Sequence, residues 1–174
     1  KSGGTDFTGS MILGHQTTGT LNNAQYNTAV GINAMDALTS GDYNTAIGKD
    51  ALTANTEGIS STAIGYTALQ SNTTGDYNTA SGAHALQSNT TGHYNVAVGN
   101  EALKSNIDGY YNVATGTNAL TFNTSGNHNI AMGHQALKTN TTGIRNIAIG
   151  SNAYEEADTE NDNLAIGYSA LRGP

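Results

Sequence analysis

Residues 94–110 read YNVAVGNEALKSNIDGY, and residues 111–127 read YNVATGTNALTFNTSGN. The first Asn, the glycine after it, the Ala-Leu pair and the Asn three residues after that pair (Asn106 and Asn123) fall at the same places in both segments. We call residues at equivalent places a column. The first glycine column recurs at every seventeenth position, at Gly14, Gly31, Gly48, Gly65, Gly82, Gly99, Gly116, Gly133, Gly150 and Gly167. Ten units in phase leave no room for a separate globular domain, so residues 1–174 are predicted to form a single repeat domain.

The short period decides the fold class. Helical-pair repeats need more than about 30 residues and propeller blades about 40, whereas about 17 residues suffice for two short strands and two turns. Segments such as 95–98 are strand-like, and 72–75 (Asn-Thr-Thr-Gly) has turn chemistry in which Gly75 is expected to supply a positive φ. We therefore predict an all-β, parallel β-roll (a β-solenoid) of about ten coils, roughly 48 Å long at ~4.8 Å per coil.

Several columns are nearly invariant along the chain and are predicted to lie inside the coil. The position two before the first glycine is Ala from Ala29 to Ala165, and the position four before it is nearly always Asn, as at Asn95. Both point to the same strand face, since side chains alternate along a strand. A Leu column that includes Leu103 is the recurring bulky apolar position in the second half of the coil, and it is expected to fill the interior.

The opposite strand face is also apolar. It carries Thr28 and Val30 near the N-terminus and becomes fully apolar further on, as at Val96, Val98 and Ile149. Strands that are apolar on both faces are normally covered on both, and a two-sided roll buries only one. The other face needs a partner, and further copies of the same chain are the simplest cover. We therefore expect a homo-oligomer.

Composition excludes several classes of partner. The chain has six Lys plus Arg, a formal net charge of −7 and no cysteine. A nucleic-acid partner would need a basic stripe, and a thiolate metal site or thiol catalysis would need cysteine. No apolar run approaches the ~18 residues of a membrane span, so direct membrane insertion is not expected.

Residues 43–48 (YNTAIG) and 95–99 (NVAVG) resemble the Asn-Ser-Val-Ala-Ile-Gly motif of YadA-like trimeric autotransporter adhesin heads, and similar repeats occur in phage-type tail fibres. The resemblance covers essentially the whole chain. It implies a left-handed, trimeric β-roll rod that works in host-cell or glycan attachment, outside the cell, at its surface or on a virion. One departure is the coil length, because the coils of adhesin heads are about three residues shorter than those of this chain. The extra residues are expected to lengthen the Asn-Thr-Thr-Gly turn.

Two sets of residues are candidates for contact with a receptor or glycan. The first is a tyrosine column, in which the rings either stack on sugars or stack on one another and close a corner of the coil; its candidates are Tyr43, Tyr77, Tyr94 and Tyr111. The second lies just after the first glycine, where the sequence varies from coil to coil; its candidates are Tyr66, His84, Asn100 and His134.

Other patterns have a structural and a functional interpretation. The Asn column that includes Asn72 and Asn89 matches glycosylation sequons, but a hydrogen-bonded amide ladder is the expected role. The histidines, His15 among them, lie in scattered columns without metal-ligand spacing and are expected to be exposed turn residues. The acidic run 155–162 could bind a hard cation, although a solvated loop is the default for such a run.

Catalysis finds little support, and neither a cofactor nor a metal ion is expected. No Ser, His and acid recur as a set, so we predict a non-enzymatic protein. The alternatives are a hexapeptide-like acyltransferase, whose coils are built from three sides of a hexapeptide each, and an ice-binding β-solenoid. The latter would use the rank Thr28, Thr45, Thr62 and Thr79, which turns apolar from Val96 onward.

Overall fold

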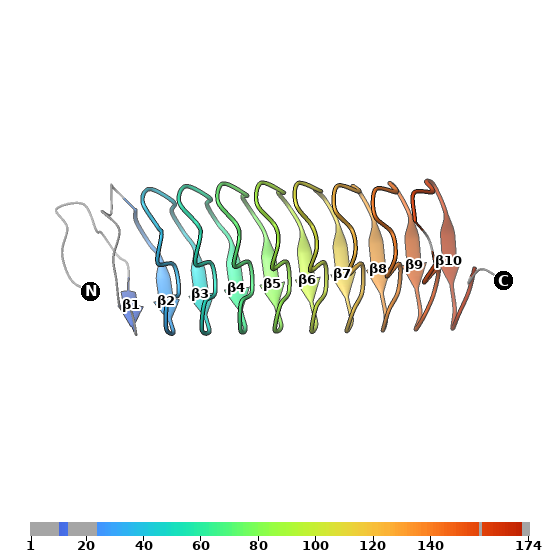
Figure 1. Cartoon of the computed structure of the whole chain (residues 1–174), viewed down its shortest axis with the longest axis horizontal. Coiled ribbons are helices and arrows are strands. Elements are labelled where there is room, and N and C mark those ends of the chain that lie inside the picture. Colours follow the sequence, from blue (N-terminus) through green and yellow to red (C-terminus); the bar gives the residue numbers. More distant parts are fainter. Residues whose placement is uncertain (1–10, 14–23, 157, 172–174) are drawn as a thin grey trace.

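The computed structural model describes residues 11–13, 24–156 and 158–171, and these form a single parallel sheet wound as a stack of coils (Figure 1). Each strand pairs with the next at an offset of one repeat, for example Ala97 with Ala114. The predicted all-β solenoid, with one sequence repeat per coil, is confirmed. The strands are β1 (Met11–Leu13), β2 (Thr28–Val30), β3 (Thr45–Ile47), β4 (Thr62–Ile64), β5 (Thr79–Ser81), β6 (Val96–Val98), β7 (Val113–Thr115), β8 (Ile130–Met132), β9 (Ile147–Ile149) and β10 (Leu164–Ile166).

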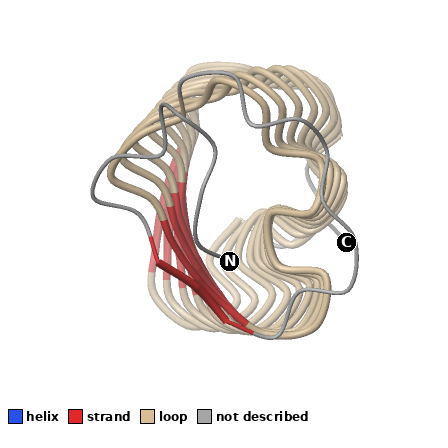
Figure 2. Ribbon diagram, turned by 90° about the vertical axis from the view of Figure 1, so that its left-hand side faces the viewer, coloured by secondary structure: helices blue, strands red, loops and turns tan. Residues whose placement is uncertain are grey.

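Each described coil has one strand, so the prediction of two strands per coil is wrong. Seen along the stack, the strands form one side of the cross-section and turns close the rest (Figure 2). The turn half cannot be a strand because Glu101 (φ 57°) and Leu103 (φ 50°) occupy the left-handed region. It still bonds to its neighbours: Glu101 donates its N–H to Ala83 of the preceding coil at 2.9 Å, and Leu103 donates to Ala119 of the following coil at 3.0 Å.

The two glycine columns serve different purposes. Glycines of the first column have positive φ, 130° at Gly99, and a Cβ at Gly99 would lie 2.7 Å from the carbonyl of Gly116. Gly75 in the second column does not have positive φ, so that prediction is wrong. Glycine is required there because a Cβ would collide with the side-chain oxygen of Asn72 and the carbonyl oxygen of Gly92.

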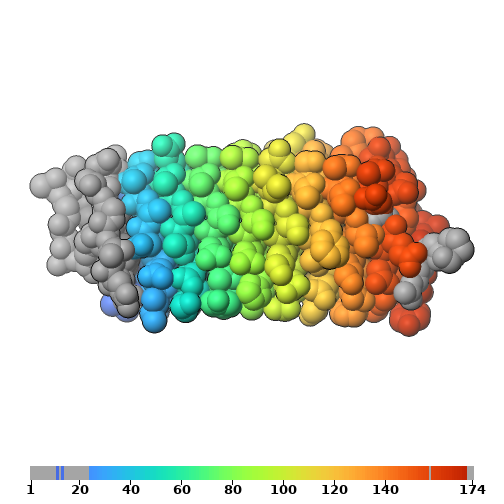
Figure 3. Space-filling view, in the orientation of Figure 1, coloured from blue at the N-terminus to red at the C-terminus, as the bar shows by residue number. Residues whose placement is uncertain are grey.

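The predicted core is confirmed. Ala97 and the other described alanines two before the first glycine are buried, as are Leu103 and its equivalents from Leu52 to Leu137. Leu171 in the last described coil is 56% exposed, so the prediction is wrong for this residue, which has no following coil among the described residues to cover it. On β6, Ala97 is fully buried whereas Val98 is exposed, so the structure identifies the Ala face as the inside of the coil. Each coil contributes only a narrow band to the surface, and the bands follow one another in sequence order (Figure 3).

Two ladders of buried asparagines run along the interior. Asn89 donates through Nδ2 to Asn72 Oδ1 at 2.8 Å and to the carbonyl oxygen of Gly92 at 3.0 Å, and its Oδ1 accepts from Asn106 at 2.7 Å. In the other ladder, the Oδ1 of Asn95 accepts the N–H of Asn112 at 3.0 Å. The expected amide ladder is thus confirmed, and the sequon asparagines 72, 89, 123 and 140 are fully buried in it.

The tight enclosure of the Ala column predicts contrasting effects of two Leu substitutions. Ala97→Leu should lower the free energy of unfolding by about 1–3 kcal/mol or more through overpacking, whereas Asn100→Leu on the exposed corner should be mild. Urea unfolding followed by circular dichroism measures both. Equal tolerance at the two positions would contradict the assignment of inside and outside.

The amide ladder predicts a large effect of a small truncation. Asn89→Ala removes three side-chain hydrogen bonds and leaves buried partners on Asn72 and Asn106 unpaired, so it should cost about 2–4 kcal/mol of stability. Thr91→Ala, two residues away and exposed, is the matched control and should cost little. Equal thermal unfolding temperatures for the two variants would contradict a structural role for the ladder.

Candidate functional site

Three neighbouring columns make up the outward side of the sheet. Along residues 94–100, Tyr94, Val98 and Asn100 are exposed and Val96 is half-buried, while Asn95 and Ala97 are buried. The alternation places an aromatic column, an apolar stripe and a variable corner side by side on every regular coil. We call them the aromatic ladder, the outward stripe and the glycine corner.

The outward stripe is an exposed apolar band along the sheet. In the single chain the side chain of Met132 exposes 43% of its surface, Ile149 38% and Ile166 64%. Polar residues interrupt the band at Thr79 and Ser81 on β5 and at Thr115 on β7. The threonine rank that an ice-binding surface would use is therefore confined to β2–β5. The stripe consists of Met11, Leu13, Val30, Ile47, Ile64, Val96, Val98, Val113, Ile130, Met132, Ile147, Ile149, Leu164 and Ile166.

The aromatic ladder is a stack of rings, as the structural interpretation of the tyrosine column predicts. Tyr94 lies between Tyr77 and Tyr111 with ring centroids 4.9 Å away on both sides, and His128 continues the stack 5.1 Å from Tyr111. Tyr26 and Tyr43 form a separate stacked pair at 5.0 Å. Because both faces of Tyr94 are covered by neighbouring rings, a sugar cannot stack on them without displacing a ring.

The glycine corner carries a small polar and aromatic cluster. The ammonium of Lys49 lies 5.3 Å from the ring centroid of Tyr66, and the ring of His84 meets Tyr66 edge-on at 5.2 Å. The Nδ1 of His84 is 2.9 Å from the hydroxyl of Thr67. Tyr66, His84, Asn100 and His134 therefore belong to one edge of the rod, with Tyr66, Asn100 and His134 exposed and His84 half-buried.

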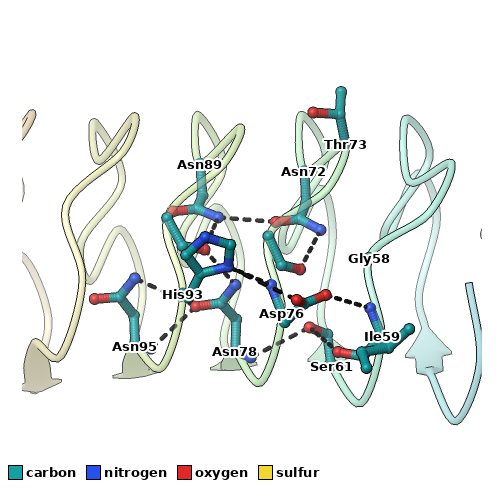
Figure 4. A network of polar contacts seen from close by, with 12 residues as sticks. Gly58, Ile59, Ser61, Asn72, Thr73, Asp76, Asn78, Asn89, His93 and Asn95 are labelled. Atoms are coloured by element: carbon teal, nitrogen blue, oxygen red, sulfur yellow. Dashed lines mark hydrogen bonds and ion pairs between the residues drawn. The ribbon is translucent and has the colours of Figure 1, made fainter.

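A further set of contacts went unnoticed in the sequence: the column just before the ladder caps backbone N–H groups of the preceding coil. Asp42 accepts the N–H of Gln25 at 2.7 Å. Figure 4 shows two further bonds of this kind: Asp76 accepts the N–H of Ile59 at 2.8 Å, and His93 Nδ1 accepts the N–H of Asp76 at 3.1 Å. Asp, His and Asn can all accept a hydrogen bond in this way. Because the column contains different residue types, the sequence does not show at once that they share the role of hydrogen-bond acceptor. Their common spacing of one repeat is the signal that could have indicated it.

One coil breaks both polar and aromatic columns. Ser60 stands where the ladder has a ring, and Ser61 stands where the buried column has Asn. The Ser61 hydroxyl accepts the N–H of Asn78 at 3.2 Å, a longer bond than the 3.0 Å by which Asn78 Oδ1 accepts the N–H of Asn95 (Figure 4). The fold tolerates the break because the hydroxyl still supplies an acceptor.

The acidic run holds itself together through its own backbone. Glu160 accepts the N–H groups of Asp158 at 2.8 Å and Thr159 at 3.1 Å, and these bonds lower the pKa of its carboxyl group. Within residues 11–13, 24–156 and 158–171, no three His, Asp or Glu side chains converge as metal ligands. His15 lies outside the described residues. The same ranges contain no helix long and apolar enough to cross a membrane.

Asp50, at the glycine corner, makes the stability of the fold depend on pH. The amide of Asn33 donates to Asp50 at 2.8 Å and the ammonium of Lys49 lies 2.9 Å away, and these contacts lower the pKa of the carboxyl group, the Asn33 bond most strongly. A lowered pKa in the folded state stabilises the fold at pH values above the pKa of the unfolded chain. That contribution is lost as the pH falls through the folded pKa.

We therefore expect Asp50→Asn to lower the free energy of unfolding at pH 7 and to have a diminishing effect as the pH drops below about 4. Chemical unfolding at a series of pH values measures the difference between variant and wild type. Asp108→Asn, an exposed carboxylate in a turn, is the control. A difference that stays constant down to pH 2 would contradict the role of the Asp50 charge.

No protein-family model, no curated protein and no solved structure matches the chain. What the protein does must be inferred from the stripe, the ladder and the corner.

Proposed function

We propose that the chain is a non-enzymatic structural and attachment module, a rod segment of a trimeric fibre or surface adhesin of the tail-fibre or adhesin-head type. Such a rod would work outside the cell, at its surface or on a virion. One observation carries the proposal: a band of exposed Val, Ile, Leu and Met side chains runs along the outward face of the sheet. Soluble monomers rarely leave such a long apolar band in water.

Copies of the same chain are well suited to cover the stripe. Coils of identical height make the stripe straight and periodic, so a second copy aligned along the rod presents the same spacing of apolar side chains. The aromatic ladder, with its tyrosine hydroxyl groups, and the glycine corner flank the outward stripe, as a polar rim flanks the apolar core of an interface. The number three comes from the resemblance to trimeric adhesin heads.

Attachment is assigned to the glycine corner. Its side chains vary between coils, from Lys49 to Tyr66, Asn100 and His134, while the core columns stay constant. A receptor protein or a cell-surface glycan would meet many weak contacts repeated over coils and over three chains. Such multiplicity raises the overall affinity without any single strong site.

The oligomeric state tests the structural half of the proposal. Light scattering of the purified chain should give a mass close to three times 17.8 kDa. Met132→Glu together with Ile149→Glu would place unpaired charges in the stripe and should shift the mass to that of one chain. Thr142→Glu, in an exposed turn, is the control and should leave the mass unchanged. A wild-type monomer would overturn the proposal.

Binding to cells or to a glycan array tests the attachment half. Replacing Tyr66, His84, Asn100 and His134 by Ala together should reduce binding at least tenfold while mass and unfolding temperature stay close to those of the wild type. These four side chains lie on the surface or half-buried, so their loss leaves the core columns intact. Full binding by the quadruple variant would remove the corner from the attachment surface.

A further inference from the structure

The aromatic ladder has a fault at Ser60, which lies between positions that carry tyrosine on both sides. Tyr26 and Tyr43 form a stacked pair on its N-terminal side, and Tyr77 begins the next stack on its C-terminal side. Ser60 occupies the ladder position between them, and its φ of 53° lies in the same left-handed region as that of the tyrosines. The backbone bonds continue without interruption, since Ser60 donates to Asp42 at 2.9 Å and Tyr77 donates to Ile59 at 3.0 Å. The fault therefore removes a ring and leaves its position on the rod in place.

The missing ring uncovers an aromatic face. Tyr43 exposes 60% of its surface, whereas Tyr77 and Tyr94 each expose 46%. Tyr94 has rings on both faces, and Tyr77 is no more exposed than Tyr94, so the opening lies on the side of Tyr43. Tyr43 and Tyr77 are two coils apart, which corresponds to about 10 Å along the rod at ~4.8 Å per coil. That interval holds one flat group at ring-stacking distance from Tyr43.

A carboxylate lies next to the residue that precedes Ser60. The carboxylate of Asp76 reaches down to the coil of Ser60, where it accepts the N–H of Ile59 at 2.8 Å (Figure 4). His93 turns its Nδ1 to the backbone, where it accepts the N–H of Asp76 at 3.1 Å, and this nitrogen lies 4.0 Å from the carboxylate oxygen. A flat group that carries positive charge satisfies both the open ring and the carboxylate.

We propose that the fault at Ser60 is a binding site for a planar cation, the guanidinium of an arginine carried by a partner polypeptide. A guanidinium stacks on aromatic faces and forms charge-assisted hydrogen bonds with carboxylates, whereas an ammonium does not stack as a plane. The chain itself places such a group in this column, because Arg145 occupies the ladder position after His128 and pairs with Asp162 at 2.5 Å. The formal net charge of −7 favours approach of a cationic segment.

Four variants separate the components of the site. Ser60→Tyr restores the repeat and fills the gap with the chain's own ring, and Tyr43→Ala removes the open face. Asp76→Asn removes the charge but keeps an acceptor for the N–H of Ile59, as Asn127 does for Tyr110 in the same column. Asp42→Asn is the matched control, because the carboxylate of Asp42 bonds to Gln25 on the far side of Tyr43 from the gap.

The measurement is an NMR titration of the full chain, with labelled tyrosine rings, against N-acetyl-arginine amide, N-acetyl-lysine amide and methyl glucoside. The ring signals of Tyr43, assigned with Tyr43→Phe, should shift saturably with the arginine compound and at least threefold less with the lysine compound. Read at Tyr43, Ser60→Tyr should weaken arginine binding at least tenfold and Asp76→Asn at least threefold, while Asp42→Asn leaves it unchanged. In Tyr43→Ala, any shift that the arginine compound causes in the ring signals of Tyr77 should be lost. Ser60→Tyr should unfold at a temperature no lower than the wild type, which separates blocking from misfolding.

Three results would overturn the proposal. Arginine binding that persists in Ser60→Tyr would place the site elsewhere. Full affinity in Asp76→Asn would show that the gap does not select a cation. A shift of Tyr43 by methyl glucoside without one by the arginine compound would assign the gap to a sugar ring. The titration reads Tyr43 directly, so its result is independent of the oligomeric mass and of cell binding.

Discussion

The hydrogen bonds between neighbouring coils are the interaction on which the structure depends. Within a coil, few backbone groups find partners, because the turn half alternates left-handed residues such as Glu101 and Leu103. Their N–H groups reach the preceding and the following coil, and the asparagine ladders repeat the same exchange with side chains. Left-handed backbone at non-glycine residues costs roughly 1–2 kcal/mol each, and the stack persists because every coil templates the next.

A coil this thin can hide only one side of its strand. Ala97 fills the inside, where it is fully buried, and Val96 and Val98 point outward. The outward apolar residues cannot be moved into the coil without exchanging the whole strand register, since neighbouring side chains point to opposite faces. The size of the coil therefore leaves the apolar stripe on its outer surface.

Regular columns made much of the fold predictable from the sequence. Ten copies within one chain show which positions tolerate no change, so the burial of Ala97, Leu103 and Asn89 follows from their constancy. The single strand per coil did not follow, because Leu ordinarily avoids the left-handed region and nothing in the Ala-Leu pair signals it. The reason for Gly75 could not be predicted either. A glycine column shows that glycine is required, but a positive φ and a collision of a Cβ with Asn72 would both produce such a column.

Where the sequence departs from the repeat, the surface exposes groups that the regular coils cover. In the regular part of the ladder, each ring face of Tyr94 is covered by another ring of the same chain. The regular ladder therefore leaves no free ring face on which a ligand could stack. A stack of identical coils offers only ring edges, and a missing ring exposes a face. Ser60 does this at no cost to the backbone ladder, because the left-handed turn there is held by bonds between coils and not by the tyrosine side chain. In a protein of this kind the constant columns determine the rod, and the rare exceptions among them determine what it can hold.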